Sequence, residues 1–268
     1  MPIPLNIVII GTGNVATHIA QSFQENKTVN LLQAFNHRLS KLTKVFASQF
    51  TCEVVTDYKK INTTADIYII AVKDDAILEV AKNLSLLKLK GIVVHTSGSV
   101  DMTVLKNAST QIGVYYPLQT FFSGAIINWK AAPLLVEANT PSAYKKLHIL
   151  AASVSDIVKK VDSKKRLQLH LAAVFACNFT NAMYVTAYQL IETHLSKKDT
   201  VLLFPLMQQS FDKLKTTHPI TAQTGPAKRN DKQVMKKHLE LLMPNKELIK
   251  VYELLSNLIV AQQSTTKK

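Results

Sequence analysis

The sequence is poor in cysteine, with only two among 268 residues. Cys52 and Cys177 lie far apart in the chain, and neither belongs to a C-x-x-C pair. Such isolated cysteines argue against a metal site and against a disulfide framework. They fit a protein of the reducing cytosol.

Acidic side chains are also scarce, with 18 Asp and Glu against 32 Lys and Arg, which gives a formal net charge of +14. The basic residues are spread along the chain, and no basic cluster alternates with aromatic residues as a nucleic-acid surface would. We therefore favour a solvated basic surface that attracts anionic cofactors and substrates over a nucleic-acid partner.

The long apolar stretch of residues 167–191 is interrupted by the polar side chains His170, Asn178, Asn181 and Gln189. It therefore predicts a buried helix rather than a membrane span. The N-terminus has no basic region of a secretory signal and begins with an apolar run typical of a core strand. We expect a cytoplasmic protein with no membrane partner.

Glycine is rare, yet two of the seven glycines fall in the hexapeptide GTGNVA, Gly11–Ala16. An apolar, β-branched run precedes it and a helical pattern follows, which is the context of a dinucleotide-binding turn. Gly11 permits the tight turn, Gly13 lets a pyrophosphate approach the backbone, and the helix N–H groups then face the phosphates. The weaker alternative is a tight turn without a ligand. The expected cofactor contacts are Gly11, Thr12, Gly13, Asn14, Val15 and, after a later strand, Val72.

The segment that follows the predicted second strand, residues 30–35, contains no acidic residue. In an NAD-binding fold, an acidic residue at this point holds the ribose 2′-hydroxyl. Here the segment reads NHRLSK, and we expect Asn36, Arg38 and Ser40 to contact a 2′-phosphate instead. The sequence thus favours NADP over NAD. In the alternative, Arg38 only begins a solvent-facing helix.

Predicted strands and helices alternate along the first 162 residues. After the first two strands, others are expected at 52–55, 66–72, 91–95, 112–116, 133–138 and 156–161, with Asp75 as the N-cap of a helix over 76–84. This order predicts an α/β fold with a doubly wound parallel Rossmann sheet. Only helical periodicity follows, over 164–194, 200–215 (kinked at Pro205), 231–243 and 246–262. We expect a dinucleotide-binding domain at 1–162 and an all-helical substrate and dimerisation domain at 163–268.

Ligands in this fold bind beyond the carboxyl ends of the strands. The strand expected at 91–95 ends in His95-Thr96-Ser97-Gly98, and we expect Ser97 or His95 to donate a hydrogen bond to a substrate oxygen. The alternative is that Ser97 only forms a turn. After the next strand, Gln119 is expected to hold the substrate or the nicotinamide amide, whereas Tyr116 is expected to pack.

The long helix carries His170, Val174, Asn178 and Asn181 at spacings of four, four and three, which places them along one stripe. Buried polar side chains need partners, and a cleft facing the nicotinamide would supply them. We expect His170 to give a proton to the substrate, and Asn178 and Asn181 to hold it. The alternative is a histidine with structural partners only.

Six segments carry a family resemblance: GTGNVA, DIYIIAV with the aspartates after it, HTSGSV, YYPLQTFF, HLAAVFACNF and GPAKRND. Through them, nearly the whole chain resembles the Rossmann-like oxidoreductases whose C-terminal helical domain has no assigned function. These are related to pyrroline-5-carboxylate reductase, the β-hydroxyacid dehydrogenases and the deazaflavin-dependent NADP oxidoreductases. The resemblance implies a homodimer formed through the C-terminal helices. Where β-hydroxyacid dehydrogenases have a lysine four residues before an asparagine, this chain has Val174 before Asn178.

The pattern and the resemblance together predict an NADP-dependent oxidoreductase that transfers a hydride between the nicotinamide and a small polar carbonyl or imine. Its expected catalytic residues are His170, Asn178 and Ser97, and its expected substrate contacts are Gln119 and Asn181. The alternative is an NADP-binding sensor or regulatory module without turnover, because Val174 occupies the position of the lysine.

Overall fold

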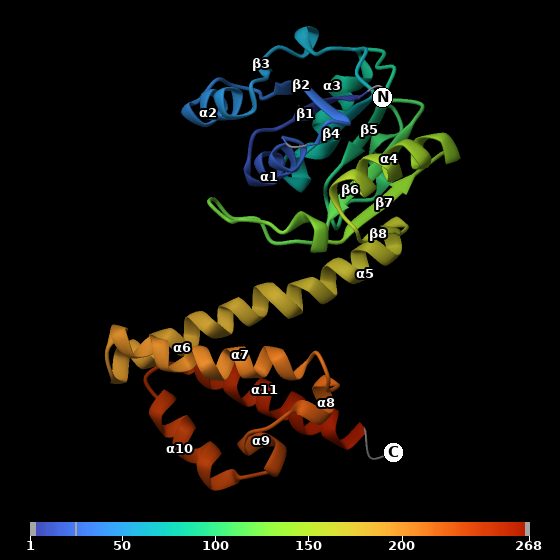
Figure 1. The fold of residues 1–268 in the computed structure, drawn as a ribbon. Coiled ribbons are helices and arrows are strands. Elements are labelled where there is room, and N and C mark those ends of the chain that lie inside the picture. The colour runs from blue at the N-terminus through green and yellow to red at the C-terminus, as the bar shows by residue number, and fades with distance from the viewer. Residues whose placement is uncertain (1–3, 25, 266–268) are drawn as a thin grey trace. The chain divides into compact units, whose positions relative to one another are not determined.

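A computed structural model of the chain describes residues 4–24 and 26–265 (Figure 1). The chain divides into two compact units, Met1–Met183 and Tyr184–Lys268, which are described separately. The strands of the first unit are β1 (Leu5–Ile10), β2 (Val29–Phe35), β3 (Glu53–Val55), β4 (Ile67–Ile70), β5 (Ile92–His95), β6 (Ile112–Pro117), β7 (Leu134–Ala138) and β8 (Val158–Lys160).

Helices connect these strands. They are α1 (Asn14–Phe23), α2 (Lys41–Phe50), α3 (Ile77–Ser85) and α4 (Pro141–Val154), with the short 3₁₀ helices η1 (Tyr58–Lys60), η2 (Asp74–Ala76), η3 (Met102–Leu105) and η4 (Trp129–Ala131). After β8 come α5 (Ser163–Ala173), the π-helix η5 (Val174–Phe179) and α6 (Thr180–His194).

One eight-stranded sheet in the order β3-β2-β1-β4-β5-β6-β7-β8 confirms the predicted doubly wound Rossmann architecture. β1 pairs in parallel with β2 on one side and with β4 on the other, so the chain reverses its winding direction at β1. The exception to parallel pairing is β7, which runs antiparallel to β6. A loop with only the short η4 joins these two strands, whereas a parallel neighbour needs a crossover that is usually a helix.

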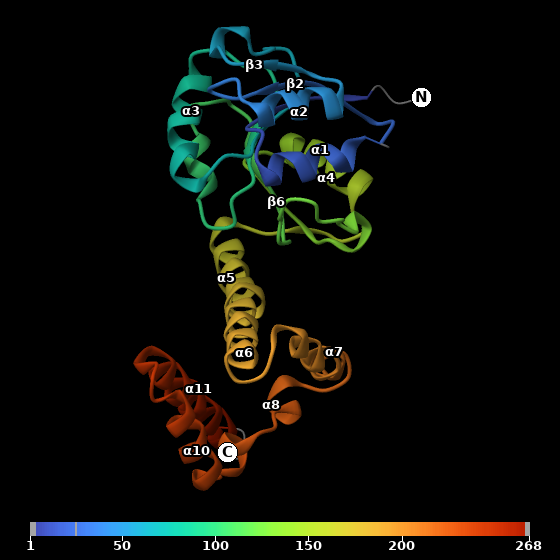
Figure 2. The ribbon, with the colours of Figure 1, turned by 90° about the vertical axis from the view of Figure 1, so that its left-hand side faces the viewer.

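The sheet is buried because its central strands are apolar on both faces. One face packs against α1, α2 and α4, and the other against α3 and η3. Figure 2 shows α3 on one side of the sheet and α1 and α4 on the other. The alternate residues of β1 divide between these two layers: Ile7 and Ile9 contact one, and Val8 and Ile10 the other.

Three local structures differ from the sequence-based expectations. Asp75 lies inside η2, and the N-cap of α3 is Ala76, which has no side-chain capping bond. The connection between β5 and β6 contains only the short 3₁₀ helix η3, where the doubly wound fold predicts an α-helix. The helix expected over 164–194 is interrupted by η5, where the hydroxyl of Thr180 donates to the carbonyl of Phe175, five residues earlier, at 3.1 Å.

The second unit contains helices, as expected: the end of α6, then η6 (Lys197–Leu203), α7 (Phe204–Lys213), α8 (Pro219–Ala222), α9 (Pro226–Arg229), α10 (Lys232–Leu242) and α11 (Lys246–Thr265). The kink expected at Pro205 is wrong. This residue stands in the first turn of α7, where its missing N–H costs no helical hydrogen bond. A hydrogen bond of 2.9 Å between Nδ1 of His238 and the hydroxyl of Tyr252 joins α10 to α11.

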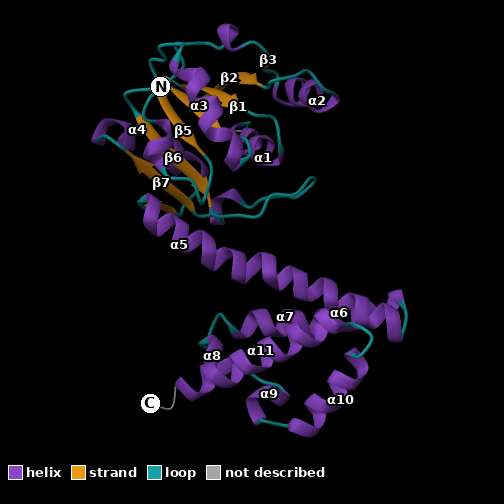
Figure 3. Ribbon diagram, turned by 180° about the vertical axis from the view of Figure 1, so that it is seen from behind, coloured by secondary structure: helices purple, strands orange, loops and turns teal. Residues whose placement is uncertain are grey.

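Every strand among the described residues ends before residue 161, and helices follow (Figure 3). The compact units divide later, at Met183, because α5 and the first turn of α6 belong to the contacts of the first unit. The domain boundary at residue 162 stays a prediction. No helix among the residues that the structure describes is long and apolar enough to cross a membrane.

Candidate functional site

The glycine turn between β1 and α1 depends on glycine at Gly11 and is open at Gly13. Gly11 has φ +113°, and a Cβ there would lie 2.3 Å from the carbonyl oxygen of Ala71 and 3.3 Å from Cγ1 of Val72. Glycine is therefore required for β1 to turn against the end of β4. At Gly13, the N-cap of α1, a Cβ would meet nothing within 4 Å. The helix N-terminus is thus open to an anionic ligand.

The end of β2 presents positive charge and no carboxylate. Arg38 is exposed, and the amide of Asn36 donates to the backbone oxygen of Arg38 at 3.4 Å. Ser40 caps α2, since its hydroxyl oxygen accepts a hydrogen bond of 3.2 Å from the backbone N–H of Thr43. Ser40 therefore has a structural task besides the expected cofactor contact.

Ser97 is buried in the loop after β5 and has several hydrogen bonds. Its hydroxyl donates to the carboxylate of Asp74 at 2.7 Å and accepts from the backbone N–H groups of Ser99 and Val100, both at 3.1 Å. The hydroxyl of Ser99 donates to the same oxygen of Asp74 at 2.5 Å. These bonds tie the loops after β4 and β5 together. They favour the turn-forming interpretation of Ser97 over a direct role in proton transfer.

His95 is fully buried at the end of β5, and its Nδ1 accepts a hydrogen bond of 3.2 Å from the backbone N–H of Ser97. Burial, and secondly the positive charge of Arg166, lower the pKa of His95 to about 4. The ring is therefore neutral at physiological pH. His95 fits a structural role better than that of a proton donor.

The structure brings His170 onto Tyr116. Nδ1 of His170 lies 3.1 Å from the hydroxyl of Tyr116, and both residues belong to the first unit. Both rings also press on the loop after β5: a Cβ at Gly98 would be 2.6 Å from Nδ1 of His170 and 2.8 Å from Cζ of Tyr116. Tyr116 was expected only to pack, because a tyrosine at a strand end gives no sign of a histidine 54 residues away.

A buried arginine fixes the start of α5, which carries His170. Arg166 is 1% exposed and pairs with Glu137 of β7. Its other guanidinium nitrogen donates to the carbonyl of Val100 at 2.5 Å and to the hydroxyl of Ser163 at 3.1 Å. This cluster could not be predicted, because Arg166 follows two lysines in a stretch of residues typical of a solvent-facing surface.

Asn178 and the predicted substrate contacts Asn181 and Gln119 are exposed. Asn178 lies within η5 and Asn181 in the first turn of α6, and the described hydrogen bonds connect neither of them to His170. The wider π turn changes the angle between successive residues, so the stripe counted at α-helical spacing does not continue through it. Gln119 accepts from the backbone N–H of its neighbour Thr120 at 2.8 Å.

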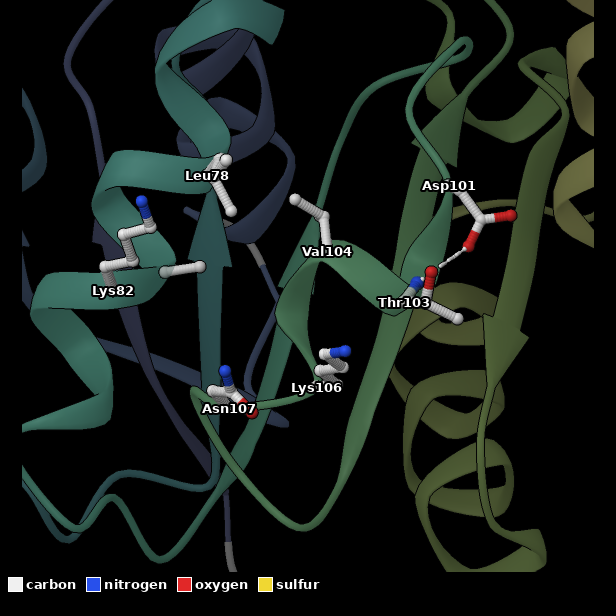
Figure 4. A pocket seen from close by; sticks show the side chains of 8 residues that line it. Leu78, Lys82, Asp101, Thr103, Val104, Lys106 and Asn107 are labelled. Carbon is white, nitrogen blue, oxygen red and sulfur yellow. Dashed lines mark hydrogen bonds between the residues drawn. The ribbon is translucent and has the colours of Figure 1, made fainter.

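A pocket of about 350 Å³ lies between α3 and the segment around η3 (Figure 4). The carboxylate of Asp101 at its rim accepts from the hydroxyl and the backbone N–H of Thr103, at 2.6 and 2.8 Å, and these bonds lower the pKa of Asp101. None of the predicted site residues lines the pocket, so we do not assign the cofactor to it. Within the described residues, no group of three or more His, Cys, Asp or Glu side chains could hold a metal ion.

Comparison with known proteins shows the family to which the chain belongs. Residues 6–98 match the family described as NADP oxidoreductase coenzyme F420-dependent, and residues 132–259 match a domain of unknown function, DUF2520. The structure of a Bacteroides fragilis protein classed as an NADP oxidoreductase has 34% sequence identity and a TM-score of 0.90, with 96% of this chain and 98% of that chain covered. The chain belongs to this NADP oxidoreductase family.

More distant solved structures share the fold of this NADP oxidoreductase. A Thermotoga maritima protein has 18% identity and a TM-score of 0.71, over 98% of this chain and all of the other. A 1-pyrroline-5-carboxylate reductase from Streptococcus pyogenes has 14% identity and a TM-score of 0.60, over 96% and 99% of the two chains. Among curated proteins, none matches the sequence significantly. The chain is thus an oxidoreductase of the Rossmann type that uses a nicotinamide cofactor.

Proposed function

We propose that this oxidoreductase uses NADPH to reduce a small polar carbonyl or imine. The observation that carries the proposal is the position of the open glycine turn and of the Tyr116–His170 pair. The glycine turn follows the carboxyl end of β1, and Tyr116 lies at the carboxyl end of β6. These strands run parallel, so both features lie at the edge of the sheet where this fold binds its ligands. The hydride travels with the cofactor, so the protein must orient the nicotinamide and supply a proton.

The residues of the turn fit a dinucleotide. The pyrophosphate and the adjoining ribose would be held by Gly11 to Val15 and by Val72. The backbone at Gly11 packs tightly against the end of β4, whereas the space beside Gly13 is open to a ligand. Arg38, with Asn36 and the hydroxyl of Ser40, would hold a 2′-phosphate. We therefore propose NADP as the cofactor, ahead of NAD.

A carbonyl or imine carbon accepts the hydride, and its oxygen or nitrogen accepts a proton. We propose His170 as the proton donor. The lysine of the β-hydroxyacid dehydrogenases cannot take this role here, because Val174 occupies its position. Asn178 and Asn181 would bind the substrate with Gln119, while Ser97 would shape the loop beneath it. The pyrroline-5-carboxylate reductase that shares the fold is named for an imine, which supports this substrate class.

A second function remains in competition: an NADP-binding sensor without turnover. It is favoured by Val174 at the lysine position and by the exposure of Asn178 and Asn181. We also propose that the protein works in the cytoplasm, because both of its cysteines are free thiols.

The decisive experiment incubates the protein with NADPH and a panel of small ketoacids, aldehydes and cyclic imines, and follows the loss of reduced-cofactor absorbance. We expect turnover that falls by about 100-fold in His170→Ala and in Asn178→Ala. The matched control is His148→Ala, an exposed histidine on α4, which should keep full activity. Tight NADPH binding with no turnover on any compound would favour the sensor. Turnover that survives both changes would contradict the residue roles.

A further inference from the structure

Tyr116 and His170 come from different elements and meet through one polar contact. Tyr116 is the residue before the last of β6, His170 lies on α5, and the hydroxyl of the tyrosine is 3.1 Å from Nδ1 of the histidine. Their rings meet edge to face, with centroids 6.1 Å apart at 77°. The hydroxyl of Tyr116 therefore contacts the imidazole at Nδ1. The second ring nitrogen, Nε2, is not part of this contact.

Gly98 limits the movement of both rings. A single added carbon at this position would lie within 2.8 Å of Cγ of His170 and of Cζ of Tyr116, well inside van der Waals contact. The backbone of the loop after β5 thus packs directly against both rings. The loop is itself held by the bonds from Ser97 and Ser99 to Asp74.

The helix backbone beneath His170 is fixed as well. Arg166 stands four residues earlier, on the same face of α5, and its buried ion pair with Glu137 attaches this turn to β7. The position of His170 is therefore determined at its backbone by Arg166 and at its ring by Tyr116 and Gly98.

Burial raises the pKa of Tyr116, so its hydroxyl stays neutral and keeps its own proton. The tyrosine is therefore a neutral hydrogen-bonding partner of the imidazole.

We propose that Tyr116 is a positioning residue whose hydroxyl oxygen accepts a hydrogen bond from Nδ1–H of His170, leaving Nε2 as the nitrogen that exchanges a proton with the substrate. The inference rests on the proposed function for the substrate step, and on geometry alone for the hydrogen bond. During reduction, the charged ring gives its Nε2 proton to the oxygen or nitrogen of the substrate as the hydride reaches the carbon. The neutral ring that remains carries its proton on Nδ1, still bonded to Tyr116.

The proposed hydrogen bond predicts that neutral His170 carries its proton on Nδ1. This tautomer is unusual, because a free neutral imidazole prefers its proton on Nε2. We would label the protein with ¹⁵N-histidine, assign His170 among its eight histidines by comparison with His170→Gln, and record the ring ¹⁵N shifts at high pH. The wild type should show a protonated Nδ1. Tyr116→Phe should move the proton toward Nε2, and Gly98→Ala should do the same by pushing the rings apart.

Tyr115→Phe is the matched control. Tyr115 is the preceding residue of the same strand, points to the other layer of the core, and has a buried hydroxyl with no hydrogen-bond partner among the described residues. Its loss should leave the ¹⁵N shifts of His170 and the activity unchanged. With an active substrate, Tyr116→Phe should lower kcat about tenfold while KM and the NADPH Kd stay within twofold.

A neutral wild-type ring protonated on Nε2, or identical ring shifts in wild type and Tyr116→Phe, would overturn the proposal. Because the spectra need no substrate, this result is separate from a failure to find turnover, which would overturn the proposed function. Turnover with an unchanged kcat in Tyr116→Phe would overturn the positioning role and leave the reaction class standing.

Discussion

At the scale of single residues, Arg38 is the side chain that should distinguish the two nicotinamide cofactors. It is exposed just beyond β2, where an NAD-binding fold has a carboxylate. Arg38→Asp exchanges an attraction to the 2′-phosphate for a repulsion. The loss of a charged hydrogen bond of about 2 kcal/mol should weaken NADPH about 30-fold. NADH, which has no 2′-phosphate, should bind at least as well as before.

Fluorescence titration of wild type and variant with both cofactors checks this. Lys90→Asp is the matched control, because it makes the same change of charge at an exposed residue just before β5, at the amino edge of the sheet. It should leave the NADPH affinity within about threefold. A wild type that prefers NADH, or an equal loss in the two variants, would refute the role of Arg38.

His95 should make the stability of the first unit depend on pH. Its folded pKa of about 4 is lower than its ordinary value of 6.5, so the unfolded chain binds more protons between these two values. Stability is therefore complete above pH 6.5 and falls as the pH drops toward 4. Between pH 7 and pH 5, this histidine should cost about 2 kcal/mol of unfolding free energy.

Urea denaturation followed by the fluorescence of Trp129, the single tryptophan, reports on the first unit. The wild type should lose about 2 kcal/mol more than His95→Asn between pH 7 and pH 5. His148→Asn, at an exposed position, should lose as much as the wild type. Equal losses in wild type and His95→Asn would show that His95 is not the group responsible.

At the scale of elements, the strands could be predicted and the unusual helices could not. The first strand, Leu5–Ile10, coincides with the apolar, β-branched run that precedes the glycine turn, because such a run favours a buried strand. The π-helix η5 and the 3₁₀ helix η3 differ from α-helices by a shift of one hydrogen-bond partner. Apolar periodicity cannot detect such a shift, so the stripe through Asn178 was counted with the wrong period.

The site shows the same division between local and distant information. Gly11 and Gly13 could be found because their task is set by neighbouring residues. Asp74, Tyr116 and Arg166 have partners 23, 54 and 29 residues away, at Ser97, His170 and Glu137. These partners meet only because the order of strands in the sheet places their segments side by side. A single sequence does not indicate which distant residues will pair.

At the scale of the whole molecule, the helix over residues 167–191 was expected to be buried, and this is wrong for a single chain, in which its large apolar side chains are exposed. Leu171, Phe175 and Phe179 are 57%, 60% and 51% exposed in the first unit. Apolar patches of this kind are common where proteins associate, and the family resemblance implies pairing through these helices. We therefore propose a homodimer in which α5, η5 and α6 of two chains contribute to the interface.

Light scattering should give about twice the 29.8 kDa of one chain. Phe175→Glu, which would bury a charge in such an interface, should shift the protein to the mass of one chain at micromolar concentration, because an unpaired buried carboxylate costs several kcal/mol. Phe122→Glu makes the same substitution at a 65% exposed residue of the β6–β7 loop, outside the proposed interface, and should keep the dimer mass. A wild type with the mass of a single chain would refute the dimer. A dimer that survives Phe175→Glu but not Phe122→Glu would place the interface at the β6–β7 loop instead.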